Sequence, residues 1–187
     1  MEILCETSVR HVHLSQNDVE ILFGKGAALQ HERDLSQPGQ YLSKQRVTLA
    51  GLKREITGVA VLGPVRKVSQ VEISRTEAFT LGLKDVPLRQ SGHLDGAPAV
   101  TLKTDLAETP ASVIIAKRHV HLDPATAEKG GFADGEIVQL KFGGERASIL
   151  DEVVIRVDKN FAPAAHLDSD EGNAVLAGTT VTVLKER

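Results

Sequence analysis

Short stretches of alternating or continuous apolar residues, separated by turn residues, recur along the 187-residue chain. Such stretches of four to eight residues are typical of β-strands with at least one buried face. The clearest are RVTLAG, REITGVAVLG, QVEISR, EVVIRVD and TTVTVL. EIVQLKFGGERASIL predicts a hairpin that turns at Gly143–Gly144, because two-residue loops prefer glycine. The pattern therefore predicts a mainly β protein with two or three short helices.

Two of these helices are predicted directly after pairs of histidines. In SQNDVEILFG, Ser15 is a suitable N-cap and Asp18 stands at the capping-box position. After the second pair, Asp123 is the expected cap and Pro124 suits the first helical position. Glycines follow both segments and should end both helices.

One hexapeptide occurs twice, as RHVHLS at residues 10–15 and as RHVHLD at residues 118–123. Each copy follows a strand-like stretch and precedes a predicted capped helix. We interpret the chain as two related halves, each with its own barrel or sandwich. The segment LKTDLAETPAS, near residues 102–112, is predicted to connect them.

Composition narrows the class of protein. Hydrophobic residues make up 41% of the chain but aromatic residues only 3%, so the core must be aliphatic and stacking platforms for nucleic acids are not expected. A net charge of −3 gives no basic field for a polyanion. The single cysteine, Cys5, allows no intramolecular disulfide. With neither a signal peptide nor a membrane span in the sequence, we expect a cytoplasmic protein with no membrane or nucleic-acid partner.

The repeated His-x-His pairs are candidate metal ligands. Residues i and i+2 of a strand point to the same face, so His11 and His13 should project together, as should His119 and His121. Paired imidazoles on a rigid strand can chelate Zn²⁺ or a similar ion. A single pair could be an accident of surface or core packing, but two copies in matching surroundings favour a metal site.

Each pair needs further ligands. Glu72 lies in a strand-like stretch, whereas His166 and Asn173 lie in APAAHLDSDEGNAVL, which we interpret as a loop rich in carboxylates. Calcium is an alternative for that loop, but the twelve-residue EF-hand pattern is missing. Arg66 follows a Gly-Pro turn, and an arginine near a metal ligand can hold phosphate through its planar fork. The alternative for Arg66 is an ordinary basic residue on a surface turn.

The motifs SVRHVHLS, LGPVRKVSQVE, IIAKRHVHLD and HLDSDEGNAVL occur in this order over nearly the whole chain. Together they resemble the PduL-type phosphotransacylases, also called phosphate propanoyltransferases. The resemblance implies two β-barrels capped by short α-helices. One barrel would comprise residues 1–9 plus 112–187 and the other residues 10–111. The two hexapeptides would meet at the barrel junction, each supplying half of a two-metal site.

The resemblance also implies roles for individual residues. One zinc ion would be held by His11, His13 and Glu72, with the coenzyme A sulfur able to take an open position. A second zinc ion would be held by His119, His121 and His166, with Asn173 near it. Phosphate would be bound by Arg66. Coenzyme A would be contacted by Ser8, Arg33, His166 and Asn173.

The reaction that the resemblance implies is the reversible conversion of acyl-CoA and phosphate into acyl phosphate and coenzyme A, with a propanoyl or acetyl group. Two alternatives use the same ligands: a two-zinc hydrolase, and a non-catalytic binding module that the metal ions stabilise. The family also implies a homodimer and, for members in propanediol degradation, residence in a bacterial microcompartment. Encapsulated members usually carry an N-terminal extension, so shell association is expected only if an extension has been removed from this chain.

Overall fold

A computed structural model describes residues 1–185. The chain forms two compact units. One contains Met1–Ser8 together with the chain from Lys117 onward, and the other contains Val9–Ala116. We refer to them as the C-terminal unit and the N-terminal unit.

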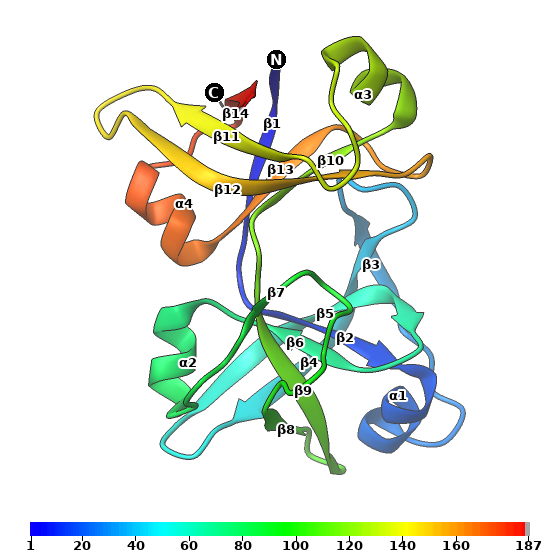
Figure 1. Ribbon diagram of the computed structural model, residues 1–187. Coiled ribbons are helices and arrows are strands. Elements are labelled where there is room, and N and C mark those ends of the chain that lie inside the picture. Colours follow the sequence, from blue (N-terminus) through cyan, green and yellow to red (C-terminus); the bar gives the residue numbers. More distant parts are fainter. Residues whose placement is uncertain (186–187) are drawn as a thin grey trace. The chain divides into compact units, whose positions relative to one another are not determined.

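The C-terminal unit is a closed six-stranded barrel with the strand order β1-β13-β10-β12-β11-β14 (Figure 1). Its strands are β1 (Glu2–Ser8), β10 (His119–Leu122), β11 (Ile137–Phe142), β12 (Ser148–Val157), β13 (Ala164–Asp168) and β14 (Thr180–Lys185). Its helices are α3 (Pro124–Gly130) and α4 (Ser169–Val175). Helix α3 follows β10 and α4 follows β13, so a helix stands directly after each of two neighbouring strands.

The N-terminal unit also closes into a ring of six strands. Their order is β4-β5-β2-β6-β9, and β8 completes the ring by pairing with both β9 and β4. The ring strands are β2 (His11–Ser15), β4 (Tyr41–Ala50), β5 (Glu55–Arg66), β6 (Gln70–Glu72), β8 (Ala99–Lys103) and β9 (Glu108–Ala116). Two further strands lie outside the ring, β3 (His31–Asp34) against β4 and β7 (Leu88–Arg89) against β9. The helices are α1 (Gln16–Phe23) and α2 (Arg75–Leu81).

The two barrels have the same topology. Strand β2 pairs parallel with β5 and antiparallel with β6, just as β10 pairs parallel with β12 and antiparallel with β13. The remaining ring pairings correspond in the same way: β4 corresponds to β11, β8 to β14 and β9 to β1. The predicted mainly β fold of two barrels with short helices and an internal repeat is therefore confirmed.

The strand before each histidine pair closes the barrel of the other unit. Strand β1 precedes β2 along the chain but pairs with β13 and β14. Strand β9 precedes β10 but pairs with β6 and β8. The expected division was residues 1–9 plus 112–187 against 10–111; in the structure β9 belongs wholly to the N-terminal unit because of these pairings. The chain thus passes between units at 8/9 and at 116/117.

Aliphatic side chains fill both barrels. In β2, Val12 and Leu14 are fully buried in the core of the N-terminal unit, and Val120 and Leu122 of β10 are fully buried in the other core. Because side chains alternate along a strand, this burial turns the histidines to the opposite face. Burial of the apolar residues stabilises each barrel by about 1.5–3 kcal/mol per large side chain, and the same packing fixes where the histidines point.

Several local predictions need correction. Residues 102–112 do not connect the two units but form most of the β8–β9 hairpin, because Thr101 pairs with Pro110 and Leu102 with Thr109. The β11–β12 loop covers residues 143–147, longer than the predicted two-residue turn. The carboxylate-rich segment after His166 is a helix, α4, rather than a loop.

The helix caps are confirmed in one case and differ in another. Asp123 caps α3, with Pro124 in the first turn, as predicted. Ser15 caps α1, but the Asp18 side chain does not complete a capping box and instead accepts the hydroxyls of Ser15, Ser69 and Thr109. Residues 1–185 contain four short helices, none long and apolar enough to cross a membrane.

Candidate functional site

The first candidate ligand set lies on two neighbouring strands of the N-terminal unit. His11 and His13 project from β2, and Glu72 ends β6 directly opposite His11 in the antiparallel register. One ligand atom from each of the three residues lies within 4.8 Å of the others. The His11 Nε2 to Glu72 Oε2 distance is 3.5 Å, close to the roughly 3.3 Å that separates two ligands of a tetrahedral zinc ion.

Both histidines of this set are prepared for metal binding. The His11 Nδ1 donates to the Val9 carbonyl at 2.9 Å, which directs Nε2 toward Glu72. A backbone carbonyl on the second ring nitrogen is the usual way in which proteins orient a ligating histidine. Burial, with the charges of His11 and Arg66, holds the pKa of His13 well below its ordinary range. His13 is therefore neutral near pH 7, the form that binds a metal.

Glu72 belongs to a partly buried hydrogen-bond chain that ends at Arg66. Its Oε1 accepts the Ser91 hydroxyl at 2.7 Å and also the Gln70 side-chain amide. Ser91 Oγ in turn accepts Arg66 Nη1 at 2.9 Å and Gln70 Nε2 at 2.7 Å. Burial alone would raise the pKa of Glu72, but His11, His13, Ser91 and Arg66 lower it to about 2. The carboxylate is thus ionised, and Arg66 is tied to it through one hydroxyl.

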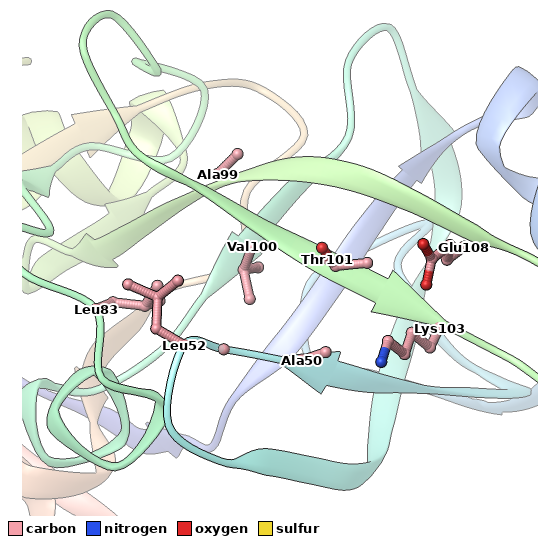
Figure 2. Close-up of a pocket in the computed structure, with 9 residues that line it drawn as sticks. Ala50, Leu52, Leu83, Ala99, Val100, Thr101, Lys103 and Glu108 are labelled. Atoms are coloured by element: carbon pink, nitrogen blue, oxygen red, sulfur yellow. The ribbon is translucent and has the colours of Figure 1, made fainter.

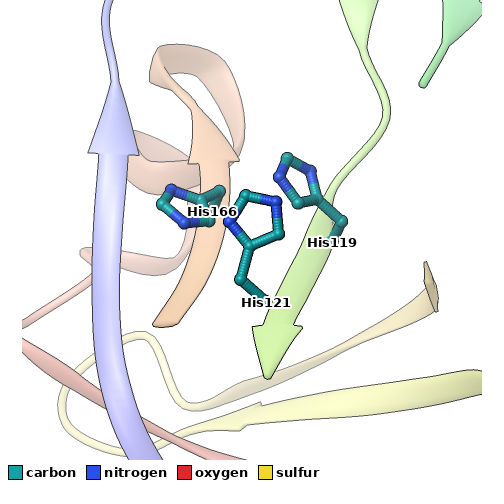
Figure 3. A group of neighbouring side chains, drawn as sticks. All are labelled: His119, His121 and His166. Carbon is teal, nitrogen blue, oxygen red and sulfur yellow. The ribbon is translucent and has the colours of Figure 1, made fainter. Parts of the chain in front are cut away.

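The second candidate set repeats this geometry in the C-terminal unit. His119 and His121 project from β10, and His166 of β13 stands opposite His119 in the register, the position that Glu72 has opposite His11. Figure 3 shows the three imidazoles gathered beside the two strands. Their ring centroids are 4.6–5.0 Å apart, and one nitrogen of each lies within 4.8 Å of the others. His119 Nδ1 donates to the Lys117 carbonyl at 2.9 Å, the counterpart of the bond from His11.

His121 provides the test of whether a metal fits here. Both of its ring nitrogens are buried without a hydrogen-bond partner among residues 1–185. Burial, then His119 and His166, lowers the pKa of His121 to about 2, so the ring is neutral and carries a buried lone pair. An unpaired polar atom in a protein interior is costly, and a metal ion would satisfy it. The His121 ring is held in place by Phe161, which stacks on it with centroids 3.9 Å apart. The residues present therefore fit a metal ion.

Three other predicted site residues lie outside these two clusters of ligand atoms. Asn173 is an exposed residue of α4, and Arg33 is an exposed residue of β3. Ser8 is half-buried at the end of β1, where it pairs with Asp168. Their assigned contacts with coenzyme A, and that of Asn173 with a metal, stay predictions.

Sequence reasoning missed three residues that support the ligands. Ser91 lies in the loop after β7 and reaches Glu72 only through the fold, so no local pattern marks it. Gln70 stands two residues before Glu72 on the same strand face, a spacing that could have suggested it. Glu6 pairs with His166 in the β1–β13 register, with its Oε2 3.5 Å from His166 Nδ1. That contact depends on β1 joining the barrel of the C-terminal unit, an arrangement that the resemblance implies but that no local pattern marks.

The N-terminal unit also has a shallow pocket between the ends of β4 and β8 (Figure 2). It is lined by Ala50, Gly51, Leu52, Leu83, Ala99, Val100, Thr101, Lys103 and Glu108. None of the candidate ligands belongs to this pocket. We therefore place the candidate chemistry at the histidine clusters.

Comparisons with known proteins identify the family of this chain. Residues 4–178 match the phosphate propanoyltransferase family. The phosphate propanoyltransferase of Clostridioides difficile is 47% identical over 185 residues, which cover 97% of this chain and 88% of that protein. The proteins of the same name from Listeria monocytogenes and Thermotoga maritima are also 47% identical, over 90% and 95% of this chain and 80% and 85% of theirs.

This chain therefore belongs to the phosphate propanoyltransferase family. Members of that family are acyltransferases, and so is this protein.

Proposed function

We propose that this acyltransferase interconverts acyl-CoA plus phosphate and acyl phosphate plus coenzyme A, with a propanoyl or acetyl group, and that it requires two zinc ions. The observation that carries the proposal is the link from Arg66 through Ser91 to Glu72. This link connects the guanidinium of Arg66, which we propose as the phosphate-binding group, to a candidate metal ligand. An ordinary surface arginine would need no such anchoring.

The zinc ions would be held by the two ligand sets, His11, His13 and Glu72 in one unit and His119, His121 and His166 with Asn173 in the other. Zinc, when bound, polarises a carbonyl oxygen and favours departure of a thiolate. The protein contributes neutral imidazoles, since the pKa values of His13 and His121 are lowered. It also contributes an ionised Glu72 that needs no proton removed at neutral pH.

Arg66 would bind and orient the phosphate. Its planar guanidinium matches two phosphate oxygens, and the Ser91 contact limits its rotation. Positioning matters because phosphate is a weak nucleophile, and holding it beside the thioester converts an encounter into an intramolecular step. A phosphate oxygen then forms a bond to the acyl carbon, the carbon–sulfur bond breaks, and its electron pair leaves with the coenzyme A sulfur.

This route requires no nucleophile from the protein. Cys5, the chain's single cysteine, is buried on β1, and burial, with Glu6 nearby, raises the pKa of its thiol to about 11. A thiol in that state is protonated at neutral pH and unreactive. Direct attack by phosphate is therefore the form of the reaction that we propose.

The same proposal includes coenzyme A contacts by Ser8, Arg33, His166 and Asn173. A homodimer and a location in the cytoplasm or in a bacterial microcompartment also belong to it. Sedimentation analysis of the purified chain tests the dimer. Coenzyme A binding to Arg33→Ala and Asn173→Ala tests the contacts. Each variant should weaken binding, and Arg33→Ala should do so without changing the metal content.

One experiment tests the central proposal. Purified protein should contain about two equivalents of zinc, and it should release coenzyme A from propanoyl-CoA only when phosphate is present. Chelation should abolish the release, and added zinc should restore it. Release that ignores phosphate would identify a hydrolase, and full activity without any transition metal would overturn the role of zinc.

A further inference from the structure

An arginine–glutamate pair accompanies each ligand set, and the inference drawn from these pairs rests on the proposed metal binding. In the N-terminal unit, Arg10 stands directly before His11, and its Nη1 donates to Glu77 Oε1 at 2.9 Å. Glu77 is the third residue of α2, and its Oε2 accepts the backbone N–H of the N-cap residue Ser74 at 2.8 Å. Ser74 follows Glu72 by two residues. One carboxylate thus joins the segment before the first ligand to the segment after the third.

The C-terminal unit contains a corresponding arginine–glutamate pair. Arg118 stands directly before His119, and its Nη1 donates to Glu171 Oε1 at 2.7 Å. Glu171 is the third residue of α4, and its Oε2 accepts the backbone N–H of the N-cap residue Asp168 at 3.3 Å. Asp168 follows His166 by two residues. The arrangement thus occurs beside both ligand sets, and in the C-terminal unit Arg118 Nε also donates to the Asp151 carbonyl at 2.6 Å.

The arginines lie in short segments outside the strands, although the Arg118 carbonyl accepts the N–H of Val154 in β12 at 3.3 Å. Val9 and Arg10 lie between β1 and β2, and Lys117 and Arg118 lie between β9 and β10, where the chain passes from one unit to the other. The carbonyls of Val9 and Lys117 are the groups that accept Nδ1 of His11 and His119. The orientation of each first ligand therefore depends on a short irregular segment.

We infer that Glu77 and Glu171 are positioning residues for the two metal-ligand sets. Each fixes an arginine, the arginine fixes the preceding carbonyl, and that carbonyl directs the first histidine of a pair toward the third ligand. Loss of a group that orients a metal ligand typically weakens metal affinity by about 10–100-fold. We expect an effect of that size from either glutamate.

If Glu77 and Glu171 only capped their helices, a different outcome would be expected. Substitution of each glutamate by glutamine distinguishes a capping role from a positioning role. Glutamine also serves at the third position of a capping box, so Glu77→Gln and Glu171→Gln keep the cap of their helices. Glutamine has one side-chain oxygen, and the cap uses it, so both variants lose the ion pair with the arginine. If the glutamates act only as caps, metal affinity should not change.

The test uses full-length chains that each keep one ligand set. His119→Ala retains the set with Glu72, and His11→Ala retains the set with His166. Co²⁺ is titrated into metal-free protein, followed by visible absorption and by competition with a chelator. We expect Glu77→Gln to weaken Co²⁺ binding about 10–100-fold in the His119→Ala chain and less than about twofold in the His11→Ala chain. Glu171→Gln should show the reverse pattern.

Glu55→Gln is the matched control, because it breaks the ion pair with Lys103 in the N-terminal unit without touching a ligand segment. It should leave Co²⁺ affinity unchanged. If a glutamine variant fails to fold, as judged by circular dichroism, Arg10→Ala or Arg118→Ala takes its place with the same expectations, because it removes the ion pair and leaves the cap intact. Equal affinities in all chains would overturn the positioning role alone. A wild-type chain that binds no Co²⁺ would overturn the proposed metal dependence and, with it, this inference.

Discussion

The barrel that carries Glu72 and the barrel that carries His166 share their strand order, their register and the carbonyl that orients the first histidine, but they differ in the third ligand. Glu72 is embedded in hydrogen bonds from Gln70 and Ser91 and through them is connected to Arg66. His166 has Glu6 beside it. One duplicated framework thus supports an anionic ligand set in one unit and a set of three imidazoles in the other.

Because of this difference, we expect the two ligand sets to have different roles in the reaction. A metal ion keeps more positive charge with three neutral imidazoles than with two imidazoles and a carboxylate. The carboxylate in turn provides an anchor for Arg66, the residue that we propose to bind phosphate, and an imidazole at that position could not provide this anchor in the same form. We expect variants to affect the two sets differently, and four predictions follow from the largest expected effect to the smallest.

The first prediction removes one ligand from each set. His11→Ala and His119→Ala should each lower kcat by more than about 100-fold, because even the loss of groups that support a ligand typically costs 10–100-fold. Each variant should keep about one equivalent of zinc, measured by elemental analysis. Loss of both equivalents in a variant whose circular dichroism is unchanged would mean that the two sets form one shared cluster.

The second prediction concerns Arg66. Arg66→Ala should lower kcat/KM for phosphate at least about tenfold, since charge-assisted hydrogen bonds contribute about 1.5–3 kcal/mol each. The KM for acyl-CoA should change little, and Arg66→Lys should recover part of the loss. Steady-state kinetics that vary each substrate in turn provide the measurement. If Arg66→Ala changed only the kinetics with acyl-CoA, Arg66 would not be the residue that binds phosphate.

The third prediction converts one set into the other. Glu72→His should keep zinc at both sets but lower kcat/KM for phosphate about tenfold, because Ser91 loses its acceptor and Arg66 loses its anchor. Elemental analysis and kinetics on the same preparation separate metal content from activity. If kcat/KM for phosphate were unchanged, Glu72 and a histidine would be interchangeable as the third ligand. The difference between the two barrels would then not affect catalysis.

The fourth prediction tests the hydroxyl between Arg66 and Glu72. Ser91→Ala should reduce kcat/KM for phosphate about two- to twelvefold, the range expected for one lost hydrogen bond of about 0.5–1.5 kcal/mol. Zinc content should stay unchanged, since Glu72 is not altered. Thr104→Ala is a suitable control, because Thr104 also lies in the N-terminal unit but bonds only the backbone of Leu22 and the 104–107 turn. Equal effects of the two substitutions would indicate a general loss of stability.

The sequence predicts the histidine pairs well because the cause is local. Alternation along a strand places His11 and His13 on one face while Val12 and Leu14 enter the core, and the structure repeats this in β10. The third ligands are different, since Glu72 and His166 are brought beside the pairs by strand pairing that no spacing encodes. The sequence names both residues as candidate ligands, but only the resemblance to a family assigns each of them to a particular pair.

Other features escaped prediction for similar reasons. The helix α4 was interpreted as a loop, although Asp168 and Glu171 have the capping-box spacing. Ser91 approaches Glu72 across a loop, and Glu6 approaches His166 across an exchanged strand, so both contacts depend on distant parts of the chain. Local patterns therefore indicated the elements, whereas most support for the ligands comes from tertiary structure.

The exchange of β1 and β9 has a consequence for how the protein is made. All strands of the N-terminal unit lie between Val9 and Ala116, so its barrel can close while the ribosome is still synthesising the rest. Strand β1 emerges first, but its partners β13 and β14 emerge last. At about 5–20 residues per second, β1 waits roughly 10–35 s with both edges unpaired. An unpaired edge invites association with other chains, so nascent copies on one messenger RNA are exposed to mispairing during that interval. A rearranged gene that begins at Val9 and encodes β1 after β14 would remove the delay.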